Sequence, residues 1–272
     1  MQDLIIEAGR TERQYWRDLW RYRELFMFLA WRDLLVRYKQ TIVGATWSIV
    51  RPLLMMTVLT IVFGRLAKMP SAGVPYTIFV FCALIPWQFF AAAVSECGNS
   101  LVGNSALISK VYFPRMTIPF SSIITSFVDL MLSGLLLTLL MMWYQFVPDL
   151  KVLTLPLFLL MAFAAALGIG LWISALMVRY RDFRFIVPFL VQFGLYLSPV
   201  GFTSEIVPAE WRTLYGLNPM VGVIDGFRWS ILGGATRWHW PSFFVSLGVV
   251  GLMLVSGIKY FRHTERTFAD VI

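Results

Sequence analysis

Apolar residues gather into six long stretches, separated by shorter segments that carry most of the charge. A helix rises about 1.5 Å per residue and the hydrocarbon layer of a bilayer is roughly 30 Å thick, so a span needs about 20 mostly apolar residues. The fifth stretch is short and carries Pro188 and Pro199, so we expect it to be kinked or to end part-way through the bilayer. The pattern predicts an all-α integral membrane protein with six transmembrane helices. The stretches are Val43 to Gly64, Tyr76 to Val94, Ile118 to Phe146, Val152 to Val178, Phe185 to Phe202 and Pro241 to Phe261.

The segment from Glu12 to Lys39 is too charged to be a span, yet its apolar residues follow helical spacing. One stripe contains Tyr15, Leu19, Tyr22, Phe26 and Leu29. Arg17 and Arg21 lie elsewhere on the circumference, as in an amphipathic helix. We expect residues 1–42 to form a cytoplasmic N-terminus whose amphipathic helix lies in the membrane interface, ahead of a transmembrane domain over residues 43–272. The alternative is a soluble helix that packs on a partner protein.

The loop of residues 203–240 is too long for a plain connector. Asn218 is an expected N-cap and Pro219 an expected first helical residue, after which one apolar stripe runs to Leu232 and ends at Gly233. We expect two short re-entrant helices over about residues 203–234, before the last span. Irregular chain of this kind is tolerated in a membrane where protein covers it or where it lines a cavity.

The fourth stretch is rich in small residues. It contains the pairs Ala164/Gly168 and Ala166/Gly170, each four residues apart. Small residues at this spacing favour close packing of one transmembrane helix on another.

Composition supports the membrane assignment, and the distribution of positive charge orients the chain. Of the 272 residues, 58% are hydrophobic and 14% charged, against about 25% charged in soluble domains. A net charge of +8 would suggest nucleic acid in a soluble protein, but here the positive residues flank the spans. The segments on the side of the two termini carry 16 Lys and Arg, and the opposite loops carry 6. The positive-inside rule therefore predicts cytoplasmic termini and a multi-pass protein without a nucleic-acid partner.

No motif for catalysis or metal binding is present. The chain lacks G-x-x-x-x-G-K-[ST], G-x-S-x-G and H-E-x-x-H, and its two histidines lie at opposite ends of the last span. Cys82 and Cys97 are interpreted as small buried residues. We expect a transport subunit rather than an enzyme, with no metal and no cofactor of its own.

Two charges lie inside the spans, where they are costly and usually face a cavity or a partner. Arg51 and Asp129 stand at compatible depths, which suggests an ion pair. Snorkelling of Arg51 to the cytoplasmic interface is the alternative, because Pro52 beside it already marks a break. In an ion-coupled transporter, Asp129 and Glu96 would be the coupling carboxylates.

Aromatic residues make up 16% of the chain. Most are expected to face lipid or the membrane interface. Aromatic faces also stack on sugar rings, so some could line a path for a glycan. The candidates are Trp87 in the second stretch and, on one helix face of the fifth, Phe185, Phe189, Phe193 and Tyr196.

The cytoplasmic segment from Asn104 to Arg115 is apolar although it lies outside the spans. We expect a short helix over about residues 104–113, with Asn104 as its N-cap and Pro114 ending it. Such a helix needs a protein groove, or else the membrane surface, to cover it. Its expected contact residues are Leu107, Ile108, Lys110, Val111, Tyr112 and Phe113.

Four segments together resemble the type-2 ABC exporter permeases, in particular those that export O-antigen, capsular or teichoic acid polysaccharides. They span most of the chain in the expected order. They are Arg32 to Trp47, Leu107 to Arg115 with Ile118-Pro119, Arg179 to Asp182, and Asn218-Pro219 with Phe227-Arg228.

The resemblance implies a six-helix half-transporter in the bacterial inner membrane that forms a homodimer and recruits two copies of a separate ATP-binding subunit. ATP and Mg would bind to that subunit. The helix from Asn104 to Phe113 would be the coupling helix, the segment around Trp16 to Leu29 the interface helix, and residues 203–234 the outer gate. The first and fifth spans would line a channel for a lipid-linked polysaccharide, O-antigen above all. Arg17, Arg21 and Arg51 are then candidates for contact with a lipid diphosphate.

Three other classes remain open. A lipid or drug exporter of the same superfamily would share the architecture, although it usually adds a larger outer domain or a fused ATPase. A membrane-embedded glycosyl- or acyltransferase would show D-x-D or His/Asp clusters, which this sequence lacks. An ion-coupled transporter would depend on a gradient rather than on ATP.

Overall fold

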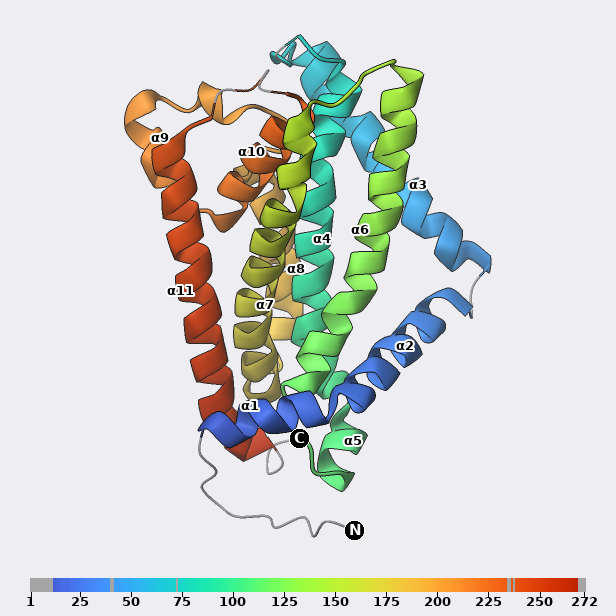
Figure 1. Cartoon of the computed structure of the whole chain (residues 1–272), viewed down its shortest axis with the longest axis vertical. Coiled ribbons are helices and arrows are strands. Elements are labelled where there is room, and N and C mark those ends of the chain that lie inside the picture. Colours follow the sequence, from blue (N-terminus) through green and yellow to red (C-terminus); the bar gives the residue numbers. More distant parts are fainter. Residues whose placement is uncertain (1–11, 40–41, 72, 234–235, 237, 269–272) are drawn as a thin grey trace.

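The computed structural model describes residues 12–39, 42–71, 73–233, 236 and 238–268, and within these ranges it contains helices and no strand. The long helices α4 (Tyr76–Gly103), α6 (Thr117–Trp143), α7 (Leu155–Arg179) and α11 (Trp240–Thr264) form a bundle (Figure 1). We call the end that carries α1 and α5 the inner end, and the end that carries α9 and α10 the outer end. The predicted all-α membrane fold is confirmed.

Five helical segments of the described chain are long and apolar enough to cross a membrane, where the sequence predicted six spans. Four are the long helices of the bundle, with α7 preceded by the 3-10 turn Leu150–Thr154. The fifth combines α3 (Ile42–Leu59) with the π-helix Thr60–Leu66. The remaining stretch forms α8 (Phe183–Leu197), whose 15 residues extend only about 22 Å. It ends before Pro199 and is shorter than the hydrocarbon layer, which is roughly 30 Å thick.

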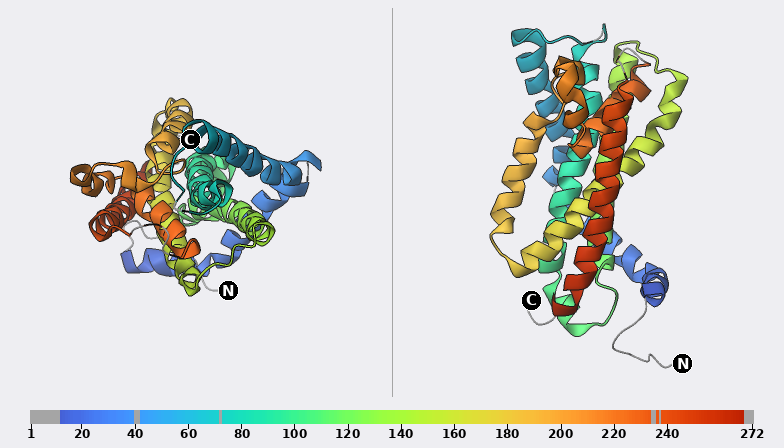
Figure 2. Two further views of the ribbon diagram at one scale, coloured as in Figure 1. Left: turned by 90° about the horizontal axis from the view of Figure 1, so that it is seen from above. Right: turned by 90° about the vertical axis from the view of Figure 1, so that its left-hand side faces the viewer.

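Helix α4 is the centre of the bundle (Figure 2, left). It contacts α6 and α7 along its length and also meets α3, α8 and α10. Between residues 78 and 94 the helix is apolar on nearly every face, which is the pattern of a helix surrounded by others. Cys82 and Cys97 on α4 are free and buried, as interpreted from the sequence.

Small residues bring α7 and α11 into backbone contact. A Cβ added to Gly168 would lie 2.6 Å from the backbone nitrogen of Leu254, and one added to Gly257 would lie 2.3 Å from the carbonyl oxygen of Gly168. Gly170 faces α4 in the same way, with Cys97 Sγ at 2.6 Å from an added Cβ. The close packing predicted from the fourth stretch is confirmed at these glycines.

The outer loop folds into the 3-10 turn Ser204–Ile206, α9 (Ala209–Tyr215) and α10 (Pro219–Ile231). Asn218 caps α10 as predicted, because its Oδ1 accepts a hydrogen bond from Met220 N at 3.0 Å. Nearly all of α10 is buried against α4, α7 and α11. The second helix of the loop therefore returns into the bundle.

The N-terminal segment forms α1 (Glu12–Arg21) and α2 (Arg23–Lys39), which cross the inner end of the bundle (Figure 1). Tyr15, Leu19, Tyr22 and Leu29 of the predicted stripe pack against the core of the same chain. Trp20 and Phe28 on other faces are exposed. The apolar stripe is thus covered by the bundle itself, and the outward surface that α1 and α2 present still holds large aromatic residues.

Candidate functional site

A short helix, α5 (Ser105–Lys110), projects from the inner end of the bundle between α4 and α6 (Figure 1). It ends three residues earlier than the sequence predicted, and Val111 is already extended. Pro114 disfavours helical conformation at the residue before it, Phe113. The segment after α5 therefore returns to the bundle as extended chain.

The residues predicted to form one contact surface on this segment are divided between core and surface. Ile108 and Phe113 are buried, and Leu107 is partly buried against the core. Val111 is 49% and Tyr112 54% exposed. Because the chain's own core covers the first group, the predicted contact residues that remain open to a partner are Lys110, Val111 and Tyr112.

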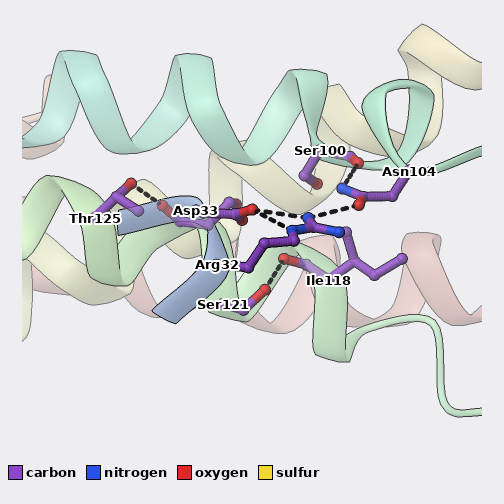
Figure 3. Close-up of polar contacts among 8 residues, drawn as sticks. Arg32, Asp33, Ser100, Asn104, Ile118, Ser121 and Thr125 are labelled. Atoms are coloured by element: carbon purple, nitrogen blue, oxygen red, sulfur yellow. Dashed lines mark hydrogen bonds and ion pairs between the residues drawn. The ribbon is translucent and has the colours of Figure 1, made fainter. Parts of the chain in front are cut away.

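Asn104 connects the junction of α4 and α5 to α2 (Figure 3). Its Oδ1 accepts a hydrogen bond from Arg32 Nη2 at 2.7 Å, and its Nδ2 donates to the carbonyl of Ser100 at 2.8 Å. Arg32 also donates to Asp33 Oδ1 through Nε at 3.0 Å and Nη2 at 2.7 Å. Asn104 occupies the N-cap position of α5 as predicted, but its side chain makes no capping hydrogen bond and instead ties α2 to the base of that helix.

A second group of charges lies one to two turns further along α2. Arg37 Nη2 is 2.6 Å from Asp129 Oδ2 on α6, and Arg37 Nη1 is 3.5 Å from Glu96 Oε1 on α4. Tyr38 donates to Asp129 Oδ1 at 2.6 Å. Partial burial, followed by the bond to Asp129 and its charge, raises the pKa of Tyr38 to about 12, so the hydroxyl stays protonated well above neutral pH.

The predicted pairing of Asp129 with Arg51 is wrong. Asp129 faces α2, where Arg37 and Tyr38 hold both of its carboxylate oxygens. Arg51 lies on α3 with its side chain exposed. The depths of Arg51 and Asp129 along their spans were compatible with a pair, but Asp129 points toward α2, where it meets Arg37.

A third contact joins both ends of the described chain to the segment after α5. Glu265, in the 3-10 turn Glu265–Thr267, accepts hydrogen bonds from Tyr15 Oη at 2.8 Å and from Arg115 N at 3.0 Å. The guanidinium of Arg262 lies 4.5 Å from the centre of the Tyr15 ring. Burial raises the pKa of Glu265 above its ordinary value, against the opposing effect of these hydrogen bonds.

These three contacts make the inner end one connected structure. Arg32, Arg37 and Tyr38 bind α2 to α4 and α6, and Tyr15 binds α1 to the end of α11. The candidate headgroup residues Arg17 and Arg21 stay exposed on α1. Sequence reasoning missed Arg37, Arg115 and Glu265, because their partners are up to 250 positions away along the chain.

The predicted channel aromatics fall on two sides of α8. Phe185, Phe189, Phe193 and Tyr196 form one exposed face, with the Phe189 and Phe193 rings stacked at 6.1 Å. Trp87 is buried behind α8, where a Cβ on Gly194 would lie 2.8 Å from its ring. Trp87 therefore does not share a surface with the other four.

An apolar cavity of about 490 Å³ lies behind α8. Its lining comes from α4, α7, α8 and the outer helices, and includes Trp87, Phe90, Ile173 and Val191. Since few α8 side chains are buried, the helix has an open aromatic face on one side and incompletely filled space on the other.

A bundle of apolar helices with a small helix projecting from one end and a re-entrant helix at the other has the organisation of a membrane permease. Residues 24–232 match the family model of ABC-2 type transporters. This range covers most of the chain, and the protein belongs to the ABC-2 type transporter family.

Curated relatives extend over nearly the same length. The chain is 24% identical over 250 residues to the O-antigen export system permease protein RfbA of Klebsiella pneumoniae, covering 92% of this chain and 95% of the relative. It is 29% identical over 214 residues to the protein of the same name from Myxococcus xanthus, covering 78% and 82%. A more distant relative is the polysialic acid transport protein KpsM of Escherichia coli, at 20% identity over 204 residues, covering 75% and 79%.

Proposed function

We propose that this chain is the transmembrane subunit of an ATP-driven exporter that moves a lipid-linked polysaccharide, O-antigen above all, across the bacterial inner membrane. Its inner end faces the cytoplasm, so both termini are cytoplasmic. ATP and Mg bind to a separate subunit, of which two copies join a homodimer of this chain. The names of the relatives support the substrate class, since two are O-antigen export permeases and one transports polysialic acid.

The observation that carries the proposal is the link between α5 and α2. A partner held at Val111 and Tyr112 acts on a segment that Arg32, through Asn104, and Glu265, through Arg115, connect to the rest of the bundle. A ligand shifts a conformational equilibrium only through contacts that differ between the two states. Closure of an ATPase against α5 would therefore reach α4, α6 and the N-terminal helices together.

The aromatic face of α8 supports a sugar substrate. Its four rings lie along one side of a helix that the rest of the chain leaves uncovered. Flat apolar rings at helical spacing suit a polymer of sugar rings that moves past them by successive contacts. The exposed apolar residues of α3 and its π-helix extension, such as Leu54 and Val58, would face lipid or the second copy of the chain.

The ion-coupled alternative is disfavoured by Arg37. In such a transporter Glu96 and Asp129 would take up and release a cation. Both carboxylates instead lie within 3.5 Å of the same guanidinium, which already supplies a positive charge.

The test is co-purification of the chain with the ABC ATPase encoded beside it, together with the amount of glycan at the cell surface. The informative variant is Val111→Arg, because Val111 is exposed whereas Leu107 also packs against the core. Ser109→Arg is the matched control, since it adds the same charge to an exposed position of α5 itself. We expect Val111→Arg to lose complex and surface glycan with normal membrane insertion, and Ser109→Arg to lose less of both.

Retention of complex and export in Val111→Arg would remove α5 as the coupling helix. Transport that survives depletion of ATP but stops when the ion gradient is collapsed would reject the proposed function in favour of ion coupling.

A further inference from the structure

Arg228 is the largest fully buried side chain of the described residues, with 1% of its surface exposed. It lies on α10 and donates three hydrogen bonds to backbone carbonyls of other segments. Its Nε bonds to Phe79 O at 3.3 Å, its Nη1 to Phe202 O at 2.7 Å and its Nη2 to Val200 O at 2.8 Å. The guanidinium therefore joins α10 to α4 and to the chain that leaves α8.

A buried guanidinium is costly unless hydrogen bonds and nearby negative or π charge compensate it. Here the ring of Phe79 lies under the guanidinium, with its centre 3.8 Å from the Cζ atom. Asp225, one turn earlier on α10, supplies negative charge nearby. The compensation depends on the fork shape of arginine, because three carbonyls at separate positions each receive a different N–H.

The chain that leaves α8, residues 197–204, forms hydrogen bonds with other segments along most of its length. Besides Arg228, Tyr76 donates to the carbonyl of Gly201, and Tyr215 donates to that of Leu197 at 2.9 Å. The hydroxyl of Ser204 donates to the carboxylate of Asp225, with oxygen distances of 2.7 Å and 2.8 Å. We call this segment, residues 197–204, the exit segment.

The exit segment also touches the first span. A Cβ on Gly201 would lie 2.7 Å from the ring of Phe63, in the π-helix that extends α3. Non-helical carbonyls at membrane depth need donors from protein or water. Arg228 and Tyr76 supply them, so hydrogen bonds join α4, α10 and the chain after α8 at one point, and Phe63 packs against that point.

We propose that Arg228 is a positioning residue that keeps the outer end of the permeation path closed through its hydrogen bonds to the exit segment. This inference rests on the proposed function for the path itself. While the three carbonyls stay bonded, α8 and α10 cannot separate at the outer end. Opening for export requires the exit segment to leave the guanidinium or to move with it.

The test measures leak through the permease without ATP or polysaccharide. The full chain, purified from the membrane, is placed in potassium-loaded lipid vesicles, and the rate of potassium release is recorded. The variant is Arg228→Lys, which keeps the charge but cannot reach all three carbonyls. Arg212→Lys is the matched control, because Arg212 donates to the carbonyls of Val207 and Glu205 from the more exposed α9.

We expect Arg228→Lys to release potassium about tenfold faster than wild type, which corresponds to about 1.4 kcal/mol in the opening equilibrium. Arg212→Lys should differ from wild type by less than about twofold. Equal leak in the two variants, or an Arg228→Lys protein as tight as wild type, would overturn the proposal.

Two milder variants keep the inference testable if Arg228→Lys fails to insert. Tyr76→Phe and Ser204→Ala each remove one hydrogen bond to the exit segment, and each should raise leak by about threefold, less than the loss of the Arg228 hydrogen bonds. Tight vesicles from both would show that Arg228 serves folding alone. The leak assay needs neither the ATPase nor the glycan. A failed export assay would therefore reject the proposed function without deciding whether Arg228 keeps the outer end closed.

Discussion

Helices α4 and α8 are both apolar, yet they differ in how much of their surface is buried. Most side chains of α4 are buried between α6, α7 and α10, whereas only Val187 and Leu195 of α8 are buried. Helix α3 resembles α8, since each packs only lightly on the rest of the chain, whereas α6, α7 and α11 pack closely on α4 or on one another. The molecule therefore has a packed half, built on α4, α6, α7, α10 and α11, and an open half formed by α3 and α8.

The contrast shows that apolar composition alone does not distinguish a membrane helix that packs in the core from one that is exposed to a substrate or a second copy of the chain. In water, an exposed row such as Phe185, Phe189 and Phe193 would be unfavourable. In lipid the same row costs little, so it is available to face a substrate or a second copy of the chain. The two halves differ in how closely their side chains are packed. Substitutions in the packed half should therefore lower stability more than substitutions in the open half.

The largest expected effect is Gly257→Leu in the packed half. An added Cβ would already lie 2.3 Å from the carbonyl oxygen of Gly168, a backbone atom that cannot move away alone. We expect a loss of stability of about 3 kcal/mol or more, and little folded protein in the membrane.

Gly251→Leu on the same helix is the control, because an added Cβ there meets no atom within 4 Å. Thermal unfolding in detergent, followed by size-exclusion chromatography, measures both variants. Equal losses would mean that α7 and α11 do not pack as described.

The next prediction compares the substitution of one phenylalanine in each half. Phe81→Ala on α4 removes a fully buried ring and should cost about 3–5 kcal/mol. Phe189→Ala on α8, where the ring is 65% exposed, should change stability by less than about 0.5 kcal/mol. The same unfolding assay, combined with surface glycan levels, should show Phe189→Ala stable but reduced in export.

A Phe189→Ala variant with full export would show that this ring does not contact the substrate. Phe244→Ala provides the control for a ring of similar exposure on α11, outside the open half. Its export should stay at the wild-type level.

Much of this division could be predicted from the sequence, but not which residues meet. Span length and hydropathy predicted the helices, and Asn218 with Pro219 predicted the start of α10, because these are local properties of the chain. The partner of Asp129 was predicted wrongly as Arg51, since depth along a helix says nothing about direction around it. The sequence also did not show that Trp87 lies behind α8, because the part of α4 around it is apolar on nearly every side.

A smaller effect is expected at Arg37, which joins α2 to the packed half. Arg37→Gln leaves Asp129 and Glu96 without their shared cation and should cost about 1–2 kcal/mol, limited by the partial exposure of the pair. Arg51→Gln on the open α3 should change stability little. If Arg37→Gln in an Asp129→Asn background costs as much as in wild type, the two residues are not coupled.

The smallest effect we predict concerns Tyr38→Phe at the same junction. The substitution removes only the hydroxyl that donates to Asp129 Oδ1 at 2.6 Å, and Arg37 still holds the other oxygen. A single hydrogen bond to a carboxylate should contribute about 1–2 kcal/mol when partly buried, at or below the effect of Arg37→Gln. Unfolding in detergent measures the loss, and Tyr196→Phe on α8, where the residue is 60% exposed, is the control. A loss in Tyr38→Phe larger than in Arg37→Gln would mean that the hydroxyl, rather than the ion pair, attaches α2 to the packed half.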